Sequence, residues 1–109
     1  MRVPSELPIC GQTIKIIYDD ECTGEVCGMA EPADNKIYIY PAMHKTEDAL
    51  LKTLAHEAFH VFLDYTGLSN HMSAETEESI ACGIENGYFP LFRFDRRKWR
   101  KTLEIQIGG

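Results

Sequence analysis

Two short apolar runs in the first half of the chain have the pattern of β-strands. Residues 11–20, GQTIKIIYDD, and residues 35–42, NKIYIYPA, are rich in β-branched and aromatic side chains and end at turn-forming residues. In the second run, Ile37 and Ile39 would lie on one face and the neighbouring tyrosines on the other, following the two-residue period of a strand. The residues between the runs, 21–35, are rich in Gly, Pro and Asp and are expected to form a loop or an irregular hairpin connection.

The second half of the chain has the pattern of two helices. Apolar residues recur at helical spacing from Leu50 to Leu63, Thr46 followed by two acidic residues can cap the start, and Gly67 can end this helix. Ser73 can cap a second helix, which would stop near Pro90. The apolar side of the second helix would consist of Ile80, Ala81, Ile84 and Tyr88.

This order of elements predicts an α+β fold in which a short antiparallel or mixed β-sheet packs on two helices. Residues 101–109 alternate apolar and polar side chains and could add a late edge strand. With 109 residues, 44% hydrophobic and 26% charged, the chain is expected to form a single domain spanning residues 1–109. No run approaches the roughly 18 apolar residues of a membrane span, and the N-terminus lacks the pattern of a signal peptide, so a soluble, cytoplasmic protein is expected.

Charge and cysteine content narrow the classes of partner. The net charge of -6 argues against a nucleic-acid partner, although six of the eleven basic residues fall in residues 93–101, RFDRRKWRK. That segment can be a solvated face or a patch for phosphate or an acidic partner. Cys22 and Cys27 are separated by four residues with no second close pair after them, which favours reduced thiols in a loop over a zinc knuckle.

Three titratable side chains interrupt the apolar pattern of the first helix. In residues 53–62, TLAHEAFHVF, His56 and His60 are four apart and would lie one helical turn, about 5.4 Å, above each other on one side. Glu57 would lie about 100° round the helix, within reach of a water on an ion held by the histidines. This HExxH spacing predicts a Zn²⁺ site in which Glu57 is the general base of peptide hydrolysis.

The third zinc ligand is less clearly indicated. A metzincin would need Gly at position 63 and His at position 66, where this chain has Leu63 and Thr66. His71 could be the ligand, as in SprT-like proteases, but the Gly that follows it there is Met72 here. A glutamate of the second helix is the favoured alternative.

The two helical segments together resemble the minimal gluzincin metallopeptidases of phages and bacteria, akin to the ImmA/IrrE family. The resemblance rests on LLKTLAHEAFHVF and ETEESIACGIENGYFPLFR and covers roughly residues 12–92. It implies a zincin-like fold, and it implies Glu78 as third ligand because Ala81 and Ile84 follow in the family's register. It also implies that the strand NKIYIYP is the sheet edge. Glu85 departs from the pattern, since the family usually has a small residue there.

Helix phase leaves Glu77 as the rival ligand. Glu77 lies near the middle of the apolar side of the second helix, whereas Glu78 lies about 110° from its centre. The histidines also lie away from the apolar side of the first helix, formed by Leu50, Leu51, Leu54, Ala58 and Phe62. A cleft beside the core favours Glu78.

The predicted function is a zinc metallopeptidase that acts on a peptide or protein bound in extended form along KIYIY. A transition-state helper would come from His71, Tyr65 or Tyr88, with His71 preferred, and His44 is interpreted as a loop residue. The alternative is a non-catalytic phage or bacterial regulatory protein with a structural zinc and a partner on its basic segment. An intact Glu57 favours the enzyme, because a purely structural zinc needs no base.

Overall fold

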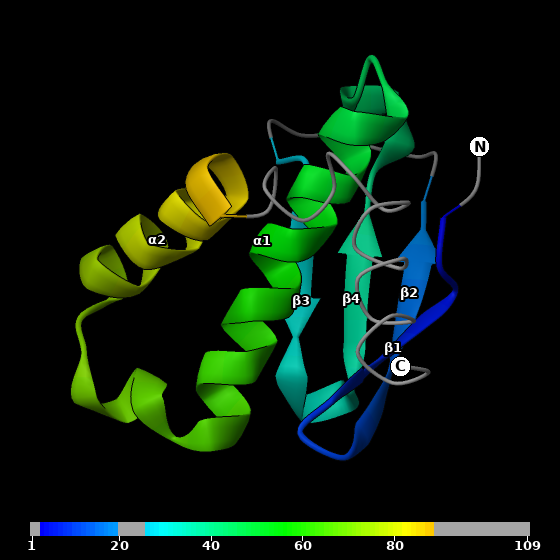
Figure 1. Cartoon of the computed structure of the whole chain (residues 1–109). Helices are drawn as coiled ribbons and strands as arrows, with labels where there is room; N and C mark the ends of the chain where they lie inside the picture. The colour runs from blue at the N-terminus through cyan, green and yellow to red at the C-terminus, as the bar shows by residue number, and fades with distance from the viewer. Residues whose placement is uncertain (1–2, 20–25, 89–109) are drawn as a thin grey trace, which may run out of the picture.

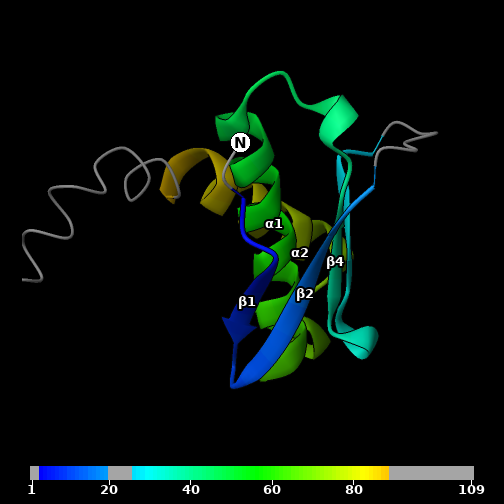
Figure 2. The same cartoon turned by 90° about the vertical axis from the view of Figure 1, so that its right-hand side faces the viewer.

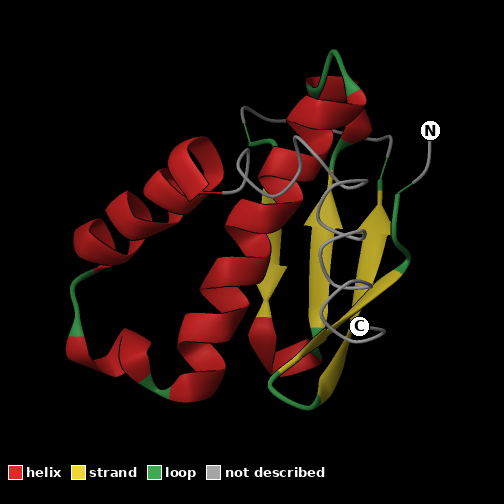
Figure 3. Ribbon diagram, in the orientation of Figure 1, coloured by secondary structure: helices red, strands yellow, loops and turns green. Residues whose placement is uncertain are grey.

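A mixed four-stranded sheet forms one layer of the computed structural model, which describes residues 3–19 and 26–88 (Figure 1). The strands are β1 (Glu6–Ile9), β2 (Gln12–Tyr18), β3 (Gly28–Glu31) and β4 (Lys36–Ile39), and the helices are α1 (Glu47–Thr66) and α2 (Ala74–Gly83). The sheet order is β1-β2-β4-β3, with β2 and β4 parallel and the two outer pairs antiparallel. The predicted α+β fold with a mixed sheet and two helices is confirmed (Figure 3).

Strands β2 and β4 fall where the pattern predicts them, but β1 and β3 do not. A two-residue turn joins β1 to β2, and both of its residues, Cys10 and Gly11, have positive φ (51° and 80°), as a type I′ hairpin turn requires. The expectation of a loop across residues 21–35 was wrong for Gly28–Glu31. Pairing with β4 makes a strand from residues of low intrinsic β-propensity.

Strand β4 is an interior strand, so the implied edge position of NKIYIYP was wrong. It pairs with β2 on one side and with β3 on the other. Because β3 forms a hairpin with β4, β3 is the sheet edge on that side of the described structure. The predicted facing is confirmed, since Ile37 and Ile39 are fully buried and Tyr38 is half-buried.

The start of both helices and the end of α1 follow the predicted capping residues, whereas α2 ends at Gly83, before the predicted stop near Pro90. Oγ1 of Thr46 accepts a hydrogen bond from the backbone N–H of Ala49 at 3.1 Å, and Gly67 ends α1 in the left-handed conformation with φ 82°. Oγ of Ser73 accepts from the backbone N–H of Thr76 at 3.1 Å. These caps satisfy backbone groups that each helix terminus would otherwise leave free.

The hydrophobic core lies between the sheet and α1. It consists of Ile14, Ile16, Ile37, Ile39, Leu50, Leu51, Leu54 and Val61. The sequence interpretation assigned Phe62 to the buried side of α1, but Phe62 is 37% exposed and stacks on Phe59. Burial instead follows Leu54, Ala58, Val61 and Tyr65, with alternating steps of four and three residues that keep these side chains on one face.

Helix α2 lies alongside α1 instead of covering the sheet (Figures 1 and 2). A short 3-10 helix, Leu68–His71, leads into it, and a π-helical turn, Ile84–Tyr88, continues from its end. Ala81 is the one buried residue of α2. No helix in the described ranges is long and apolar enough to span a membrane. The basic segment 93–101, the tail 101–109 and Cys22 lie outside the described residues.

Candidate metal centre

The two histidines of α1 face α2 because another side of the helix packs on the sheet. Leu54 and Val61 are buried against the sheet, while His56 and His60 lie between them in sequence and are only partly buried. Helical spacing of four residues stacks the two imidazoles, with ring centroids 5.0 Å apart. Packing of α1 on the sheet therefore orients both histidines toward the second helix.

Three side-chain ligand groups converge at this point. Nε2 of His56 lies 3.2 Å from Nε2 of His60, and the Glu78 carboxylate approaches both, with Oε1 2.9 Å from the first nitrogen and Oε2 3.1 Å from the second. Two nitrogens bound to one tetrahedral zinc at 2.0–2.1 Å are separated by roughly 3.3 Å. Within the described chain, His56, His60 and Glu78 form the group whose ligand atoms, all within 4.8 Å of one another, could hold a metal ion.

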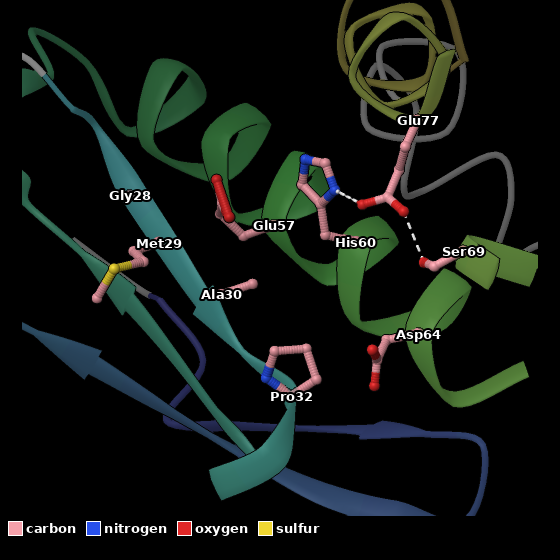
Figure 4. Close-up of a pocket in the computed structure, with 9 residues that line it drawn as sticks. All are labelled: Gly28, Met29, Ala30, Pro32, Glu57, His60, Asp64, Ser69 and Glu77. Carbon is pink, nitrogen blue, oxygen red and sulfur yellow. Dashed lines mark hydrogen bonds and ion pairs between the residues drawn. The ribbon is translucent and has the colours of Figure 1, made fainter. Parts of the chain in front are cut away.

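The other nitrogen of each imidazole is held by a carboxylate. Nδ1 of His56 lies 2.7 Å from Oε1 of Glu85, and Nδ1 of His60 lies 2.6 Å from Oε2 of Glu77. The hydroxyl of Ser69 donates to the other oxygen of Glu77 at 2.6 Å (Figure 4). That hydrogen bond is the main reason the pKa of Glu77 is lowered; burial opposes the effect and His60 adds to it. Glu77 therefore contacts Nδ1 of His60, the ring nitrogen that does not face Glu78.

Glu57 lines a cavity of about 430 Å³ between the edge strand β3 and α1 (Figure 4). Burial raises the pKa of the Glu57 carboxyl; the imidazoles of His56 and His60 oppose this rise, while Glu78 and Glu85 add to it. The cavity is lined by Gly28, Met29, Ala30, Pro32, Glu57, His60, Asp64, Ser69 and Glu77. It joins the sheet edge to the histidine cluster.

The donor set fits a divalent ion of borderline character. Two imidazole nitrogens and one carboxylate oxygen are the ligands of catalytic zinc sites that keep a fourth position for water. Both Nε2 atoms are free to bind such an ion only when Nδ1 carries the ring proton, and the carboxylates at Nδ1 favour that tautomer. The residues present are therefore compatible with zinc.

Two other candidates from the sequence, His71 and Tyr65, do not reach the cluster. His71 is exposed on the 3-10 helix and is not one of the converging ligands. The hydroxyl of Tyr65 contacts the carbonyl oxygen of Pro32 and the side-chain oxygen of Asn35, which ties α1 to the β3–β4 connection. Tyr88 is the last described residue.

His44 and Cys27 also lie apart from the cluster. His44 bridges the Tyr40 carbonyl oxygen (2.9 Å) and Oγ1 of Thr53 (2.8 Å), next to α1 and not within the cluster. Cys27 is exposed with a free thiol.

Glu85 and Ser69 are the functional candidates that the sequence interpretation missed, and Glu77 appeared there only as a rival ligand. A signal for Glu85 exists, because it follows Glu78 by seven residues, two helical turns, and so lies on a similar side. Recognising its partner requires knowing that α2 runs back along α1, which brings residue 77 to residue 60 and residue 85 to residue 56.

Comparison of the chain with models of protein families, with curated proteins and with solved structures gave no match.

Proposed function

We propose that this chain is a zinc-dependent peptidase of gluzincin type, in which His56, His60 and Glu78 hold the metal and Glu57 is the general base. The observation that carries the proposal is the convergence of three acceptor atoms. When each Nδ1 donates its proton to the carboxylate beside it, each Nε2 presents a lone pair toward the other ring and toward the Glu78 carboxylate. A cation at this point relieves the repulsion among these acceptors.

The residues around the ligands support hydrolysis over a purely structural role. When bound, zinc supplies a Lewis acid that lowers the pKa of a water and polarises a carbonyl. Glu57 lies in the cavity beside His60, where its carboxylate can accept a proton from water and later deliver it to the leaving amine. Burial raises the pKa of the Glu57 carboxyl, which makes its carboxylate a better proton acceptor.

Strand β3 is the proposed docking edge for the substrate, in place of KIYIY. Its outer edge faces the cavity that contains Glu57, and β4 occupies its other edge. An extended peptide can add to such an edge through main-chain hydrogen bonds, so its scissile bond would lie between β3 and α1. Met29 on β3 is 42% exposed and available for contact with a substrate side chain.

Metal analysis combined with substitutions at the site tests this function. The purified protein is expected to contain about one zinc per chain, and His56→Ala or His60→Ala should remove it. Glu57→Gln should retain the zinc and the fold while reducing cleavage of any substrate peptide by roughly 10²- to 10⁴-fold. Glu75→Gln, on the exposed first turn of α2, is the matched control and should leave both unchanged.

Three results would count against the proposal. Full zinc retention in both histidine variants would exclude this metal site. Undiminished cleavage by Glu57→Gln would exclude the general-base role, and a zinc-loaded wild type that cleaves nothing in a broad peptide library would favour the regulatory alternative.

A further inference from the structure

Each of the two histidines contacts, through Nδ1, a glutamate that is not among the converging ligand groups. Glu85, in the π-helical turn, meets Nδ1 of His56 at 2.7 Å, and Glu77, in the first turn of α2, meets Nδ1 of His60 at 2.6 Å. One contact lies in the first turn of α2 and the other just beyond its end, so they fall on either side of Glu78 in the sequence. The second helix and the π-helical turn that continues it thus contact both imidazoles.

These carboxylates are better enclosed than the one at the metal position. The side chains of Glu85 and Glu77 are 26% and 21% exposed, whereas that of Glu78 is 55% exposed. Hydrogen bonds to an ionised group strengthen when the group is partly withdrawn from water. Glu77 is further restrained by the Ser69 hydroxyl. Glu77 and Glu85 are therefore suited to orienting the histidines, and the more exposed Glu78 is suited to binding an ion.

We infer that Glu85 is a positioning residue for His56, and that Glu77 with Ser69 plays the same part for His60. An ionised carboxylate only accepts hydrogen bonds, so each imidazole donates its Nδ1 proton and presents Nε2 to the metal. This inference rests on the proposed zinc site but adds residues that the HExxH pattern does not contain. At position 85 the resemblance implies a small residue, so the restraint on His56 is a feature of this chain.

The register of the two helices accounts for both contacts. Residues 77 and 85 are eight apart on α2 and its continuation, while residues 60 and 56 are four apart on α1, in the reverse order. On a regular α-helix, residues eight apart point about 80° apart, whereas residues four apart point about 40° apart. The change to π-helical geometry at Ile84 falls immediately before Glu85, and such turns alter the direction of the side chains that follow.

Imidazole NMR of the full chain tests the inference one histidine at a time. In the zinc-loaded wild type, both rings should coordinate through Nε2 and show slowly exchanging Nδ1 protons. Glu85→Ala should accelerate exchange of the His56 proton about tenfold or more and leave that of His60 unchanged, and Glu77→Ala should do the converse. Glu85→Gln, which keeps an acceptor oxygen, should restore much of the protection, and zinc affinity should fall about 10- to 100-fold in Glu85→Ala.

Glu75→Ala is the matched control on α2 and should alter neither proton. Equal acceleration at both histidines in every variant would indicate general loosening and overturn the inference, as would no change at His56 in Glu85→Ala. If the wild type binds no zinc, the proposed function fails. The positioning role is then tested by the tautomer of His56 in the metal-free protein at mildly alkaline pH. There, His56 should be the Nδ1–H tautomer in the wild type and a mixture in Glu85→Ala; an unchanged tautomer would overturn the inference.

Discussion

Glu77 and Glu78 are adjacent in the chain, but their carboxylates contact opposite sides of the histidines. Glu77 reaches Nδ1 of His60, and Glu78 spans the two Nε2 atoms. Neighbouring residues on a helix point about 100° apart, which is enough to separate a ligand from a residue behind the ring. The helical phase of the sequence could favour Glu78 over Glu77 as the third ligand, but it could not assign a role to Glu77.

Zinc affinity should therefore rank the substitutions at these positions. Glu78→Ala should weaken binding most, because it removes a ligand candidate, and Glu77→Ala should weaken it about tenfold by freeing the His60 ring. His71→Ala should leave affinity unchanged, since His71 is exposed and outside the cluster. Competition with a chromophoric chelator measures all three. Zinc lost in His71→Ala and kept in Glu78→Ala would instead support the SprT-like alternative.

Gly28 keeps β3 close to the helix that carries Glu57. A Cβ at this position would lie 3.0 Å from Cγ2 of Thr53, 3.0 Å from the carbonyl oxygen of Tyr38 and 3.3 Å from Cγ of Glu57. Two of these neighbours belong to α1 and the third to the backbone of β4. A side chain here would push the strand away from the proposed base.

Gly28→Ala should lower the free energy of unfolding by about 1–3 kcal/mol through overpacking, as measured by denaturant titration. Adding Thr53→Ser removes the nearest methyl group while keeping the hydroxyl that contacts His44, so it should recover part of the loss. Gly83→Ala is the control, because nothing lies within 4 Å of its added Cβ, and it should stabilise α2 by about 0.5–1 kcal/mol. A Gly28→Ala variant as stable as the wild type would contradict the close packing.

At the scale of elements, the sequence was informative where local chemistry decides the structure. Thr46, Gly67 and Ser73 end or begin helices through their own side-chain or backbone properties, so their roles could be predicted. Strand β3 contains Gly and Ala and becomes a strand through pairing with β4, which no local pattern reports. The same long-range pairing makes β4 interior, and it could not be foreseen from NKIYIYP.

In the candidate site, too, residues that are close in sequence could be predicted and contacts between distant segments could not. His56, Glu57 and His60 share one helix, so their spacing was sufficient to place them together. Glu85 meets His56 across 29 residues of sequence, and only the docking of α2 on α1 creates that contact. The sequence therefore predicted the proposed metal-binding residues of α1, but it did not predict the contacts of Glu77 and Glu85 with the two histidines.

Ser73→Ala should reduce the stability of the metal-free protein by about 1 kcal/mol, because Oγ of Ser73 caps α2 through the Thr76 N–H. Ser79→Ala, at an exposed position inside the same helix, should change stability by less than about 0.5 kcal/mol. Thermal or denaturant unfolding followed by circular dichroism gives both values. Equal effects of the two substitutions would argue against the cap.

Across the whole molecule, apolar burial and the candidate site hold different parts together. Every residue of the core cluster comes from β2, β4 or α1, and α2 contributes only Ala81 as a buried residue in the described chain. The contacts of α2 with α1 are instead rich in carboxylates: Glu77, Glu78 and, beyond the helix end, Glu85 all meet the two histidines. Like charges in one place repel unless a cation or protonated imidazoles balance them.

Removing zinc should therefore loosen α2 while leaving the sheet and α1 folded. Hydrogen exchange of the metal-free chain should become faster for residues 74–88, with little change in β2, β4 and the Leu50–Leu54 part of α1, whose side chains form the core. Restoring zinc at 100 times its dissociation constant should add about 2.7 kcal/mol of stability if the unfolded chain does not bind it. Uniform protection with and without zinc would mean that α2 docks without the metal, and global loss of protection would mean that the core depends on it. The selective outcome is expected because the carboxylate-rich contact lies between the two helices, whereas the core between the sheet and α1 is apolar.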